Sequence, residues 1–340
     1  MTSTAGKATP ANSDAALVTL HDVREAAGRI AGVAVRTPLL ACGWADPDRP
    51  LLLKPESLQP TGAFKTRGAV NALAQLTPEE RAAGVVAQSS GNHAQAVAYA
   101  ARRLGVRATI VMPDTTPPVK LDGTRAYGAE VVVVSPAERD TLPAELVAAH
   151  GYTHIPPYDD ARIIAGQGTV GLEIGDDCVA AGIDLDVVLV PVSGGGLASG
   201  VAVAVKALFP AAKVVGVEPE LAADAGESFR AGRRVTWPAE RTYRTMADGL
   251  RTTSVGVLPF AHLSSLVDAF VTVTEEEIAE AVRVLAFGAR LVAEPSGAVA
   301  TAAYLFHAAE LPAGRTHVAV VSGGNVDPGL YARLLAGGSA

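Results

Sequence analysis

The sequence predicts an α/β protein with two domains, each built on a mostly parallel, twisted sheet flanked by helices. Short apolar strands alternate with helices in two blocks, roughly residues 80–155 and 160–340, and this alternation is typical of βαβ units. Val187–Val192 is a near-continuous apolar run, as expected for a strand covered on both faces. Glycine-rich loops follow this strand and the last one, Thr316–Val321, at positions where open α/β sheets bind ligands.

The chain length of 340 residues suits two domains. We expect residues 80–155 to form a small domain, and residues 17–79 and 156–340 to form a large one. Residues 1–16 are rich in small and polar residues and lack an apolar core. They are therefore predicted to be a disordered tail and not a signal peptide.

Composition narrows the classes of function. Hydrophobic residues make up 49% of the chain and charged residues 19%, which is typical of a globular protein. The net charge of -7, without a basic cluster, argues against nucleic-acid binding. Gly, Pro or charge interrupts every apolar run before it reaches transmembrane length. Cys42 and Cys178 lie far apart without metal-ligand spacing, which favours reduced thiols in a cytoplasmic protein.

The region before the first block begins with a helix over about residues 20–32. Thr19 can cap this helix, and its apolar residues recur at helical spacing. The elements expected next are short strands at 37–40 and 51–53 and a helix over about 63–75.

A capping box opens the first block, because Thr77 and Glu80 have the required spacing and Pro78 occupies the first helical position. Three strands, each followed by a helix, come next. The predicted strands are 85–87, 108–112 and 130–134, and the helices run to residue 104, over 118–127, and to about residue 150. A glycine follows each of these helices.

The alternation restarts after Pro156-Pro157. Thr274 and Glu277 form a second capping box that opens a helix to about residue 291. Residues 219–268 have a less regular pattern. The other predicted elements are helices over 164–181, 197–208 and 296–309, and strands at 187–192, 213–217 and 316–321.

Lys65 lies in the first turn of the helix over 63–75, directly after the turn Pro60-Thr61-Gly62. The free N–H groups and the positive end of the helix dipole disfavour a second positive charge there, and Phe64 adds an aromatic ring. These surroundings favour a neutral amine, which Schiff-base chemistry requires. An ordinary surface lysine is the simpler interpretation, so other motifs must decide.

The run Ser193-Gly194-Gly195-Gly196-Leu197 lies between an apolar strand and a helix. Glycines at such a place let backbone N–H groups converge on a phosphate, and three in succession favour this over a plain tight turn. Gly194, Gly196 and Gly200, with Glu218 after the next strand, also approximate a dinucleotide fingerprint. The third glycine is displaced from its usual place, so an NAD-dependent dehydrogenase is a weak alternative.

Two further loops follow strands. Ser89-Ser90-Gly91-Asn92-His93 offers hydroxyls, an amide, an imidazole and helix N–H groups that can hold a carboxylate. Helix capping by Ser90 or Asn92 is a common alternative. In Ser322-Gly323-Gly324-Asn325, Ser322 can offer a neutral hydrogen bond to a ring nitrogen, although a capped glycine turn fits equally well.

The segment Glu218–Asp224 carries acidic side chains on either side of the backbone carbonyl of Ala222. Such a set could hold a hard divalent cation. On spacing alone, a solvated acidic loop is the favoured interpretation.

Together these residues resemble the fold type II pyridoxal-phosphate enzymes, in particular the serine/threonine dehydratase and serine racemase family. The resemblance extends from about Leu20 to Tyr331. Its markers are Glu56–Lys65 with Arg67-Gly68, Ser90–Gln95, Ile164–Thr169, the glycine loop at 193–197, Ala247-Asp248-Gly249, Glu294-Pro295 and Ser322–Asn325.

The resemblance implies a role for each site residue. Lys65 would form the Schiff base with pyridoxal 5′-phosphate and move protons at Cα, beside Phe64, and Ser90 would serve the opposite face of Cα. Asn92 would bond the ring hydroxyl, and Ser322 would face the ring nitrogen. The remaining sets are Ser193, Gly194, Gly195, Gly196 and Leu197 for the phosphate, Ser89, Ser90, Asn92 and His93 for the substrate carboxylate, and Glu218, Ala222 and Asp224 for Mg²⁺.

The activity that the resemblance implies is a lyase reaction, the dehydration and deamination of L-serine, L-threonine or a related β-hydroxy amino acid. Serine racemisation and 3-hydroxyaspartate dehydration are alternatives within the family. A non-catalytic amino-acid sensor and the dehydrogenase are alternatives from other classes. We expect a cytoplasmic homodimer with a small amino-acid substrate and no nucleic-acid or membrane partner.

Overall fold

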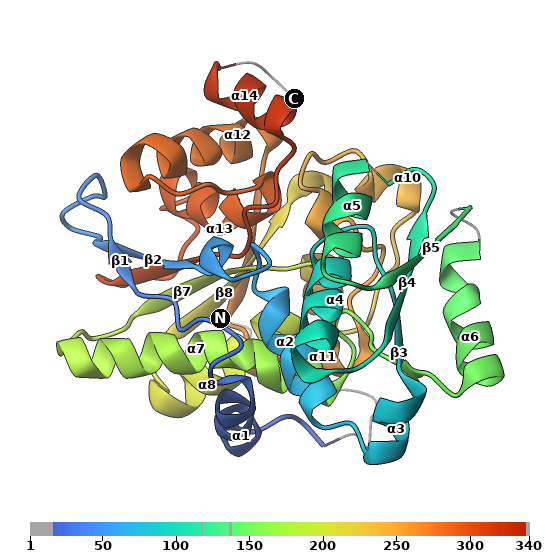
Figure 1. Cartoon of the computed structure of the whole chain (residues 1–340). Helices are drawn as coiled ribbons and strands as arrows, with labels where there is room; N and C mark the ends of the chain where they lie inside the picture. The colour runs from blue at the N-terminus through green and yellow to red at the C-terminus, as the bar shows by residue number, and fades with distance from the viewer. Residues whose placement is uncertain (1–15, 117, 136–137, 338–340) are drawn as a thin grey trace.

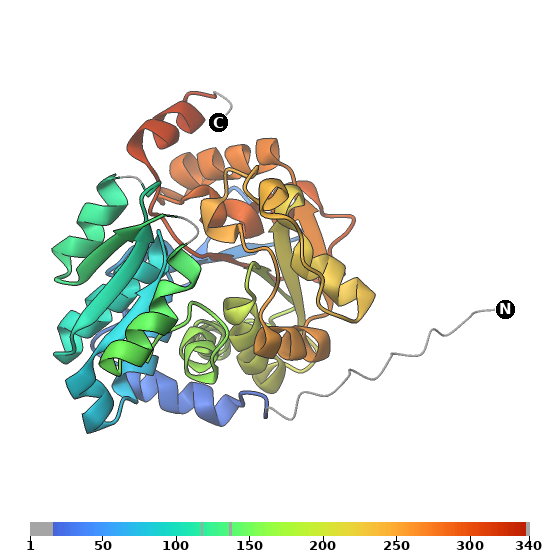
Figure 2. The same cartoon turned by 90° about the vertical axis from the view of Figure 1, so that its right-hand side faces the viewer.

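The computed structural model of the chain describes residues 16–116, 118–135 and 138–337. The predicted disordered tail therefore lies, up to residue 15, outside the described residues. Two sheets organise the molecule. In Figure 2 the elements of the smaller sheet lie on one side, in teal and green, and the later elements of the chain lie on the other, in yellow to red.

The larger sheet has six strands in the order β1-β2-β10-β7-β8-β9. All neighbouring pairs are parallel except β1 with β2. The strands are β1 Leu40–Ala41, β2 Leu51–Pro55, β7 Val187–Pro191, β8 Lys213–Pro219, β9 Ala269–Val273 and β10 His317–Val321.

The smaller sheet has four strands in the order β5-β4-β3-β6, and every pair is parallel. Its strands are β3 Val85–Gln88, β4 Ala108–Pro113, β5 Glu130–Val134 and β6 Thr153–His154. The predicted fold class, with two mostly parallel sheets flanked by helices, is therefore confirmed.

Helices cover both faces of the larger sheet, with α12 and α13 on one face and α7 and α8 on the other (Figure 1). The smaller sheet packs against α4 on one face and contacts α6 (Figure 1). The helices are α1 Leu20–Ile30, α2 Lys65–Ala74, α3 Pro78–Ala83, α4 Asn92–Leu104, α5 Pro118–Ala126, α6 Leu142–His150, α7 Ala161–Ala181, α8 Gly196–Leu208, α9 Asp224–Ala231, α10 Ala239–Thr242, α11 Val257–Leu266, α12 Glu275–Val284, α13 Pro295–Phe306 and α14 Pro328–Leu335.

Helix α2 lies between the two sheets (Figure 1). It follows β2 of the larger sheet, but its buried Val70 and Leu73 belong to the same core cluster as Val85 and Ile110 of the smaller sheet. The first residue of α2 is therefore placed where both halves of the molecule meet. The domain boundaries at residues 79 and 155 stay a prediction.

Several predicted elements differ from the structure. The strand expected at 37–40 is reduced to β1, because the hydroxyl and carbonyl of Thr37 bond Glu56 and Lys54 and Pro38 has no N–H to donate. The helix expected to reach residue 291 is α-helical only to Val284, and a π-helical turn over Leu285–Ala289 follows. The less regular region 219–268 contains α9, α10 and α11.

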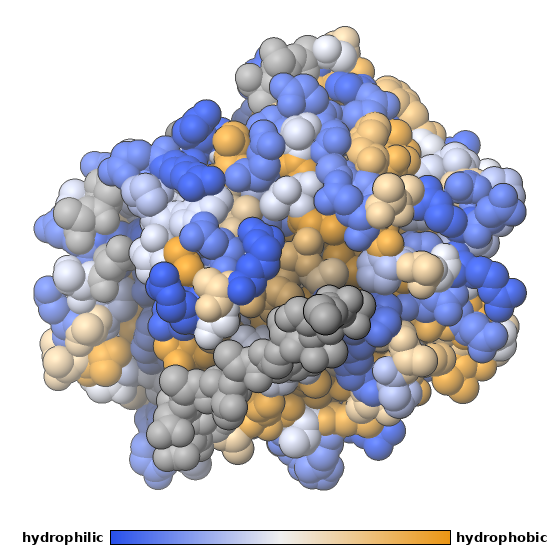
Figure 3. All heavy atoms as spheres, turned by 180° about the vertical axis from the view of Figure 1, so that it is seen from behind, coloured by the Kyte–Doolittle hydropathy of each residue, from blue (hydrophilic) through white to orange (hydrophobic). Residues whose placement is uncertain are grey.

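The surface mixes hydrophilic and hydrophobic groups on the face seen from behind (Figure 3). None of the helices in the described part of the chain is long and apolar enough to cross a membrane. Both cysteines, Cys42 and Cys178, are free.

Candidate active site

Lys65 is the first residue of α2 and follows a turn that only glycine fits. Gly62 has a φ of +72°, and a Cβ atom there would lie 2.4 Å from Oδ1 of Asn325. The ammonium of Lys65 donates to the carbonyl of Pro157 at 2.6 Å and lies 5.0 Å from the ring centroid of Phe64. Among the described residues it forms no ion pair.

Burial lowers the pKa of the Lys65 amine to about 7. The lowered pKa was predicted from the sequence and is confirmed, but its cause differs. The prediction relied on the helix terminus, whereas loss of hydration without a compensating anion accounts for the change. Lys65 is thus poised to be neutral near pH 7.

The end of β10 pairs with the segment that carries Lys65. The N–H of Phe64 donates to the carbonyl of Ser322 at 3.1 Å, and the N–H of Gly324 donates to the carbonyl of Gly62 at 2.8 Å. Ala63 and Gly323 form an antiparallel bridge. Ser322, a residue 4% exposed, is thereby placed next to the start of α2.

A chain of polar side chains joins α4 to the loops after β10 and before α13. Asn92 donates from Nδ2 to Oε1 of Glu294 at 2.6 Å, and its Oδ1 accepts from Nδ2 of Asn325 at 2.8 Å. Burial, followed by the charge of Asp248, raises the pKa of Glu294 to about 7. A Cβ atom at Gly323 would lie 2.2 Å from Oε1 of Glu294, so only glycine fits at position 323.

The loop between β3 and α4 presents the predicted carboxylate-binding residues. Oγ of Ser89 accepts from the N–H of Gly91 at 3.1 Å. His93 is buried, and its Nε2 lies 2.9 Å from the carbonyl of Ile155, so this nitrogen carries the proton. Burial, together with the charge of Lys65, lowers the pKa of His93 to about 3. The imidazole is therefore neutral and held by the backbone.

The glycine loop connects β7 to α8. Gly195 has a φ of +91°, which suits glycine alone. A Cβ atom at Gly194 would lie 2.3 Å from Cδ1 of Tyr158, so the Tyr158 ring rests on the loop backbone. Oγ of Ser193 lies 2.7 Å from Oγ1 of Thr252. The first backbone N–H groups of α8 can bind an anion that enters this loop.

Comparison with known families shows to which class of enzymes the chain belongs. A family model described as pyridoxal-phosphate dependent enzyme matches residues 30–323. The chain belongs to the pyridoxal-phosphate dependent enzymes. The predicted family is therefore confirmed, and the matched range includes the glycine loop that had suggested a dinucleotide site.

Relatives of this pyridoxal-phosphate enzyme act on amino acids. The chain is 40% identical over 324 residues to L-threo-3-hydroxyaspartate ammonia-lyase of Saccharomyces cerevisiae, covering 94% of this chain and 97% of that protein. A solved threonine deaminase, from the organism abbreviated T.th., is 47% identical with a TM-score of 0.86, covering 91% of this chain and 99% of that one. Serine racemase from Dictyostelium discoideum is 37% identical with a TM-score of 0.84, covering 92% and 100%.

The residues around Lys65 fit pyridoxal phosphate. The amine has a pKa near neutrality, and the glycine loop leaves backbone N–H groups free at the start of α8. Side chains at Gly194 or Gly195 would collide with Tyr158 or Pro259, so the loop has the bare backbone that a phosphate needs.

The predicted cation ligands form a second group in this enzyme. Glu218 lies buried near the end of β8 and accepts from the N–H groups of Ala225 and Gly226 at 3.0 and 2.7 Å. Both carboxylate oxygens of Asp224 are buried, with no hydrogen-bond partner among the described residues. Burial, with Asp224 nearby, raises the pKa of Glu218, and burial raises that of Asp224 to about 7. Two neighbouring buried acids fit a divalent ion, which would neutralise their charges.

Sequence reasoning missed several residues of the site. Glu294 was a marker without a role, yet it bonds Asn92 directly. Pro157 and Tyr158 follow β6, a strand of two residues that left no pattern in the sequence. The signal that could have found Glu294 is its place directly before Pro295, the first residue of α13, since Lys65, Asn92 and Gly196 also open helices.

Proposed function

We propose that this enzyme dehydrates and deaminates a β-hydroxy amino acid, L-threonine or L-serine first, to a 2-keto acid and ammonia. One observation carries the proposal: Lys65 is a partly buried amine without an ion pair among the described residues, with its pKa lowered to about 7. The 47% identity with a threonine deaminase supports the choice of substrate.

The chain offers a binding group for each part of the cofactor. Lys65 would carry it covalently, with Phe64 beside the ring. Ser193, Gly194, Gly195, Gly196 and Leu197 would hold the phosphate at the start of α8. Asn92 would bond the ring hydroxyl, and Ser322 would offer a neutral hydroxyl to the ring nitrogen.

The reaction needs a base at Cα and a cradle for the carboxylate. Bound pyridoxal phosphate supplies the electron sink that stabilises negative charge at Cα. Lys65 in its unprotonated form, which predominates above pH 7, accepts the Cα proton. The hydroxyls of Ser89 and Ser90 and the N–H groups at the start of α4, including the backbone N–H of His93, orient the carboxylate. Loss of the β-hydroxyl as water leaves an enamine, which hydrolyses to the keto acid and ammonia.

A substrate panel tests this proposal. Purified enzyme with the cofactor would be given L-threonine, L-serine and L-threo-3-hydroxyaspartate, and keto acid and ammonia would be measured. We expect equal amounts of both products from at least one substrate. Consumption of none of the three would overturn the proposal.

Racemisation is a second candidate activity, because Ser90 offers a second proton carrier. Its hydroxyl makes no hydrogen bond within the described part of the chain, and the chain is 37% identical to a serine racemase. Chiral analysis of serine recovered after incubation would detect D-serine. Ser90→Ala would then remove racemisation and retain elimination, whereas D-serine formation unchanged by this substitution would exclude Ser90.

We further propose that Glu218, Asp224 and the carbonyl of Ala222 hold Mg²⁺. The support is the pair of unpartnered oxygens on Asp224. Mg²⁺ at 100 times its Kd should stabilise the fold by about 2.7 kcal/mol, seen as a rise in Tm that chelator reverses. Asp224→Asn should remove the rise, and Glu220→Gln, at an exposed acid nearby, should keep it. An unchanged response in Asp224→Asn would argue against the site.

A homodimer is the assembly that the surface favours. Leu58, Phe287 and Val292 are large apolar residues exposed by 49%, 68% and 51%. Leu58 and Val292 belong to neighbouring segments, since Gly324 packs between Ser57 and the carbonyl of Val292. We expect Phe287→Glu to convert a dimer into a monomer in analytical ultracentrifugation. A cytoplasmic location is part of the same proposal, because both cysteines are free.

A further inference from the structure

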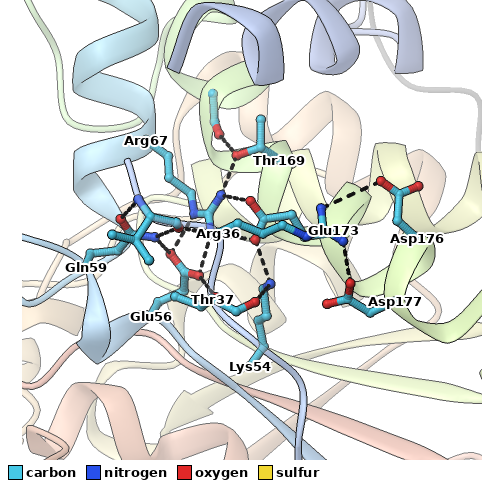
Figure 4. A network of polar contacts seen from close by, with 12 residues as sticks. Arg36, Thr37, Lys54, Glu56, Gln59, Arg67, Thr169, Glu173, Asp176 and Asp177 are labelled. Carbon is cyan, nitrogen blue, oxygen red and sulfur yellow. Dashed lines mark hydrogen bonds and ion pairs between the residues drawn. The ribbon is translucent and has the colours of Figure 1, made fainter. Parts of the chain in front are cut away.

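Four charged side chains form a buried cluster behind α2, which we call the Arg67 cluster: Lys54, Glu56, Arg67 and Glu173 (Figure 4). The first three are 0% exposed and Glu173 is 8% exposed. Two positive and two negative charges balance one another. The cluster draws on β2, the turn after it, α2 and α7.

The guanidinium of Arg67 is saturated with partners. It bonds Glu56 from Nε at 2.7 Å and from Nη2 at 2.8 Å. It also bonds Glu173 from Nη1 at 2.7 Å and from Nη2 at 2.8 Å, and Nη1 donates to Thr169 at 3.1 Å. Two carboxylates that each grip the fork at two points fix the plane of the guanidinium.

The other members of the cluster are held as firmly. Lys54 donates to Glu173 and to the carbonyl of Thr37, both at 2.6 Å. The hydroxyl of Thr37 donates to Glu56 at 2.7 Å, and Gln59 donates to Glu56 at 3.1 Å. Both carboxylates that hold Arg67 are therefore themselves fixed from other elements (Figure 4).

Stability alone does not account for such a cluster. Removing four charges from water is costly, and well-packed apolar side chains often stabilise a core equally well. Apolar side chains, however, cannot form the directional hydrogen bonds that fix the orientation of a helix. The fork of Arg67 sets both the rotation of α2 about its axis and its depth against α7.

This constraint acts two residues from Lys65. Residues two apart on an α-helix are about 200° apart around its axis, so Lys65 and Arg67 leave α2 on opposite sides. The backbone of Arg67 also touches α7, since a Cβ atom at Gly166 would lie 2.7 Å from the carbonyl of Arg67. The Arg67 cluster and this backbone contact therefore hold the first turn of α2 on the side opposite Lys65.

We propose that Arg67 is a positioning residue for Lys65: the Arg67 cluster fixes the first turn of α2, so that the amine stays beside Pro157 and away from any anion. The inference rests on the proposed function, in which Lys65 is the base at Cα. It adds the requirement that contacts on the opposite side of α2 hold this base in place.

Two substitutions at this position test the inference in the holoenzyme. Arg67→Lys keeps the positive charge but loses the planar guanidinium and its paired hydrogen bonds to the two carboxylates. The double substitution Arg67→Met with Glu173→Gln removes one charge of each sign, so the core stays neutral. We expect kcat to fall about 100-fold in both, since a misplacement of about 1 Å has this effect, while KM changes little.

The pH profile separates positioning from a merely structural role. The profile of kcat reports the pKa of the base in the substrate complex. If Lys65 loses its buried position, its pKa rises toward the ordinary value of 10.5, so the acid limb of the profile should move up by about one pH unit or more. A folded variant with native kcat and a native profile would overturn the inference.

Control variants keep the test decisive. Arg36→Gln removes an exposed arginine that pairs with Asp177 at the outer edge of the network, and it should leave kcat and the profile unchanged. Should both cluster variants fail to fold, Thr169→Val removes one bond to Arg67 and one to the carbonyl of Gly166 and should lower kcat about threefold. An unchanged kcat there would refute the proposal. Full activity in Lys65→Ala would instead refute the proposed function, whatever the Arg67 variants do.

Discussion

Lys65 and Arg67 are two basic residues in one turn of α2, and the protein surrounds them in opposite ways. Arg67 has two carboxylates at hydrogen-bond distance and no exposure to solvent. Lys65 has one carbonyl at 2.6 Å and no ion pair among the described residues. Burial lowers the pKa of both groups, but Glu56 and Glu173 outweigh it at Arg67 and raise that pKa above its ordinary value.

The difference shows how one helix separates reactivity from stability. A buried cation with anions is inert, because its charge is satisfied in place. A buried amine without an anion loses its proton and becomes a base and a nucleophile. We therefore expect substitutions on the Lys65 side to change chemistry and those on the Arg67 side to change folding and position.

The largest expected effect is on the Lys65 side. Lys65→Ala removes both the cofactor attachment and the base, so keto-acid formation should fall by about 10⁴-fold, measured under saturating substrate. The unfolding free energy should not decrease, because the substitution removes an uncompensated buried amine. Lys213→Ala, at an exposed lysine paired with Asp268, should keep native activity. Substantial activity in Lys65→Ala would break the comparison.

The next effect is on the Arg67 side. Glu173→Gln leaves Arg67 and Lys54 with only Glu56 as an anion, and breaking a buried ion cluster in this way should cost about 3–5 kcal/mol. Urea denaturation with a linear extrapolation would measure it. Glu310→Gln, at an exposed acid that pairs with His307, should change stability by less than about 1 kcal/mol. Similar losses of stability in the two variants would show that the buried Arg67 cluster contributes no more to stability than the surface pair of Glu310 and His307.

The third test moves to the loop that faces the cofactor. Gly195→Ala forces a side chain into φ +91° and places its Cβ atom 2.8 Å from Pro259. The strain of about 1–2 kcal/mol should weaken pyridoxal-phosphate binding about tenfold, measured by titration of the cofactor-free enzyme. Gly182→Ala has a φ of +65° with nothing within 4 Å, so it should share the strain and keep native cofactor affinity. Equal affinities in the two variants would speak against the phosphate loop.

The smallest effect is a pH dependence on the Lys65 side. With a pKa of about 7, the amine is protonated below pH 7 and neutral above it. The rate at which the cofactor-free enzyme forms a borohydride-reducible bond with pyridoxal phosphate should therefore rise with pH, with a midpoint near 7. A midpoint near the ordinary lysine value of 10.5 would show that burial does not activate Lys65.

The comparison also marks what the sequence could predict. Lys65, the glycine loop and Ser322 could be singled out as candidates because each lies in a local motif at the end of a strand or the start of a helix, and their roles stay predictions. The partners of Arg67 were not, because Glu173 lies 106 residues away in the middle of α7, where a buried glutamate follows the same helical pattern as an exposed one. Glu294 and Tyr158 were missed for the same reason, since their roles come from contacts across the fold.

The predicted elements show the same limit. Strands with continuous apolar runs, such as β7, were placed within a residue of the structure. The strand expected at 37–40 is shortened to β1, because Thr37 bonds Glu56 and Lys54 and does not join the sheet. Polar contacts between distant residues thus account both for the shortened strand and for the missed site residues.

The pairing of β2 with β10 has a consequence for biosynthesis. β2 contains residues 51–55 and β10 contains residues 317–321, so this pair closes a loop of most of the chain. The smaller sheet, within residues 85–154, needs only nearby partners and can assemble while the ribosome is still translating. Lys65 has its neighbour Ser322 only after residue 322 has emerged from the ribosome. We therefore expect the surroundings of Lys65 to assemble after β10 has been synthesised, and cofactor capture to follow that step.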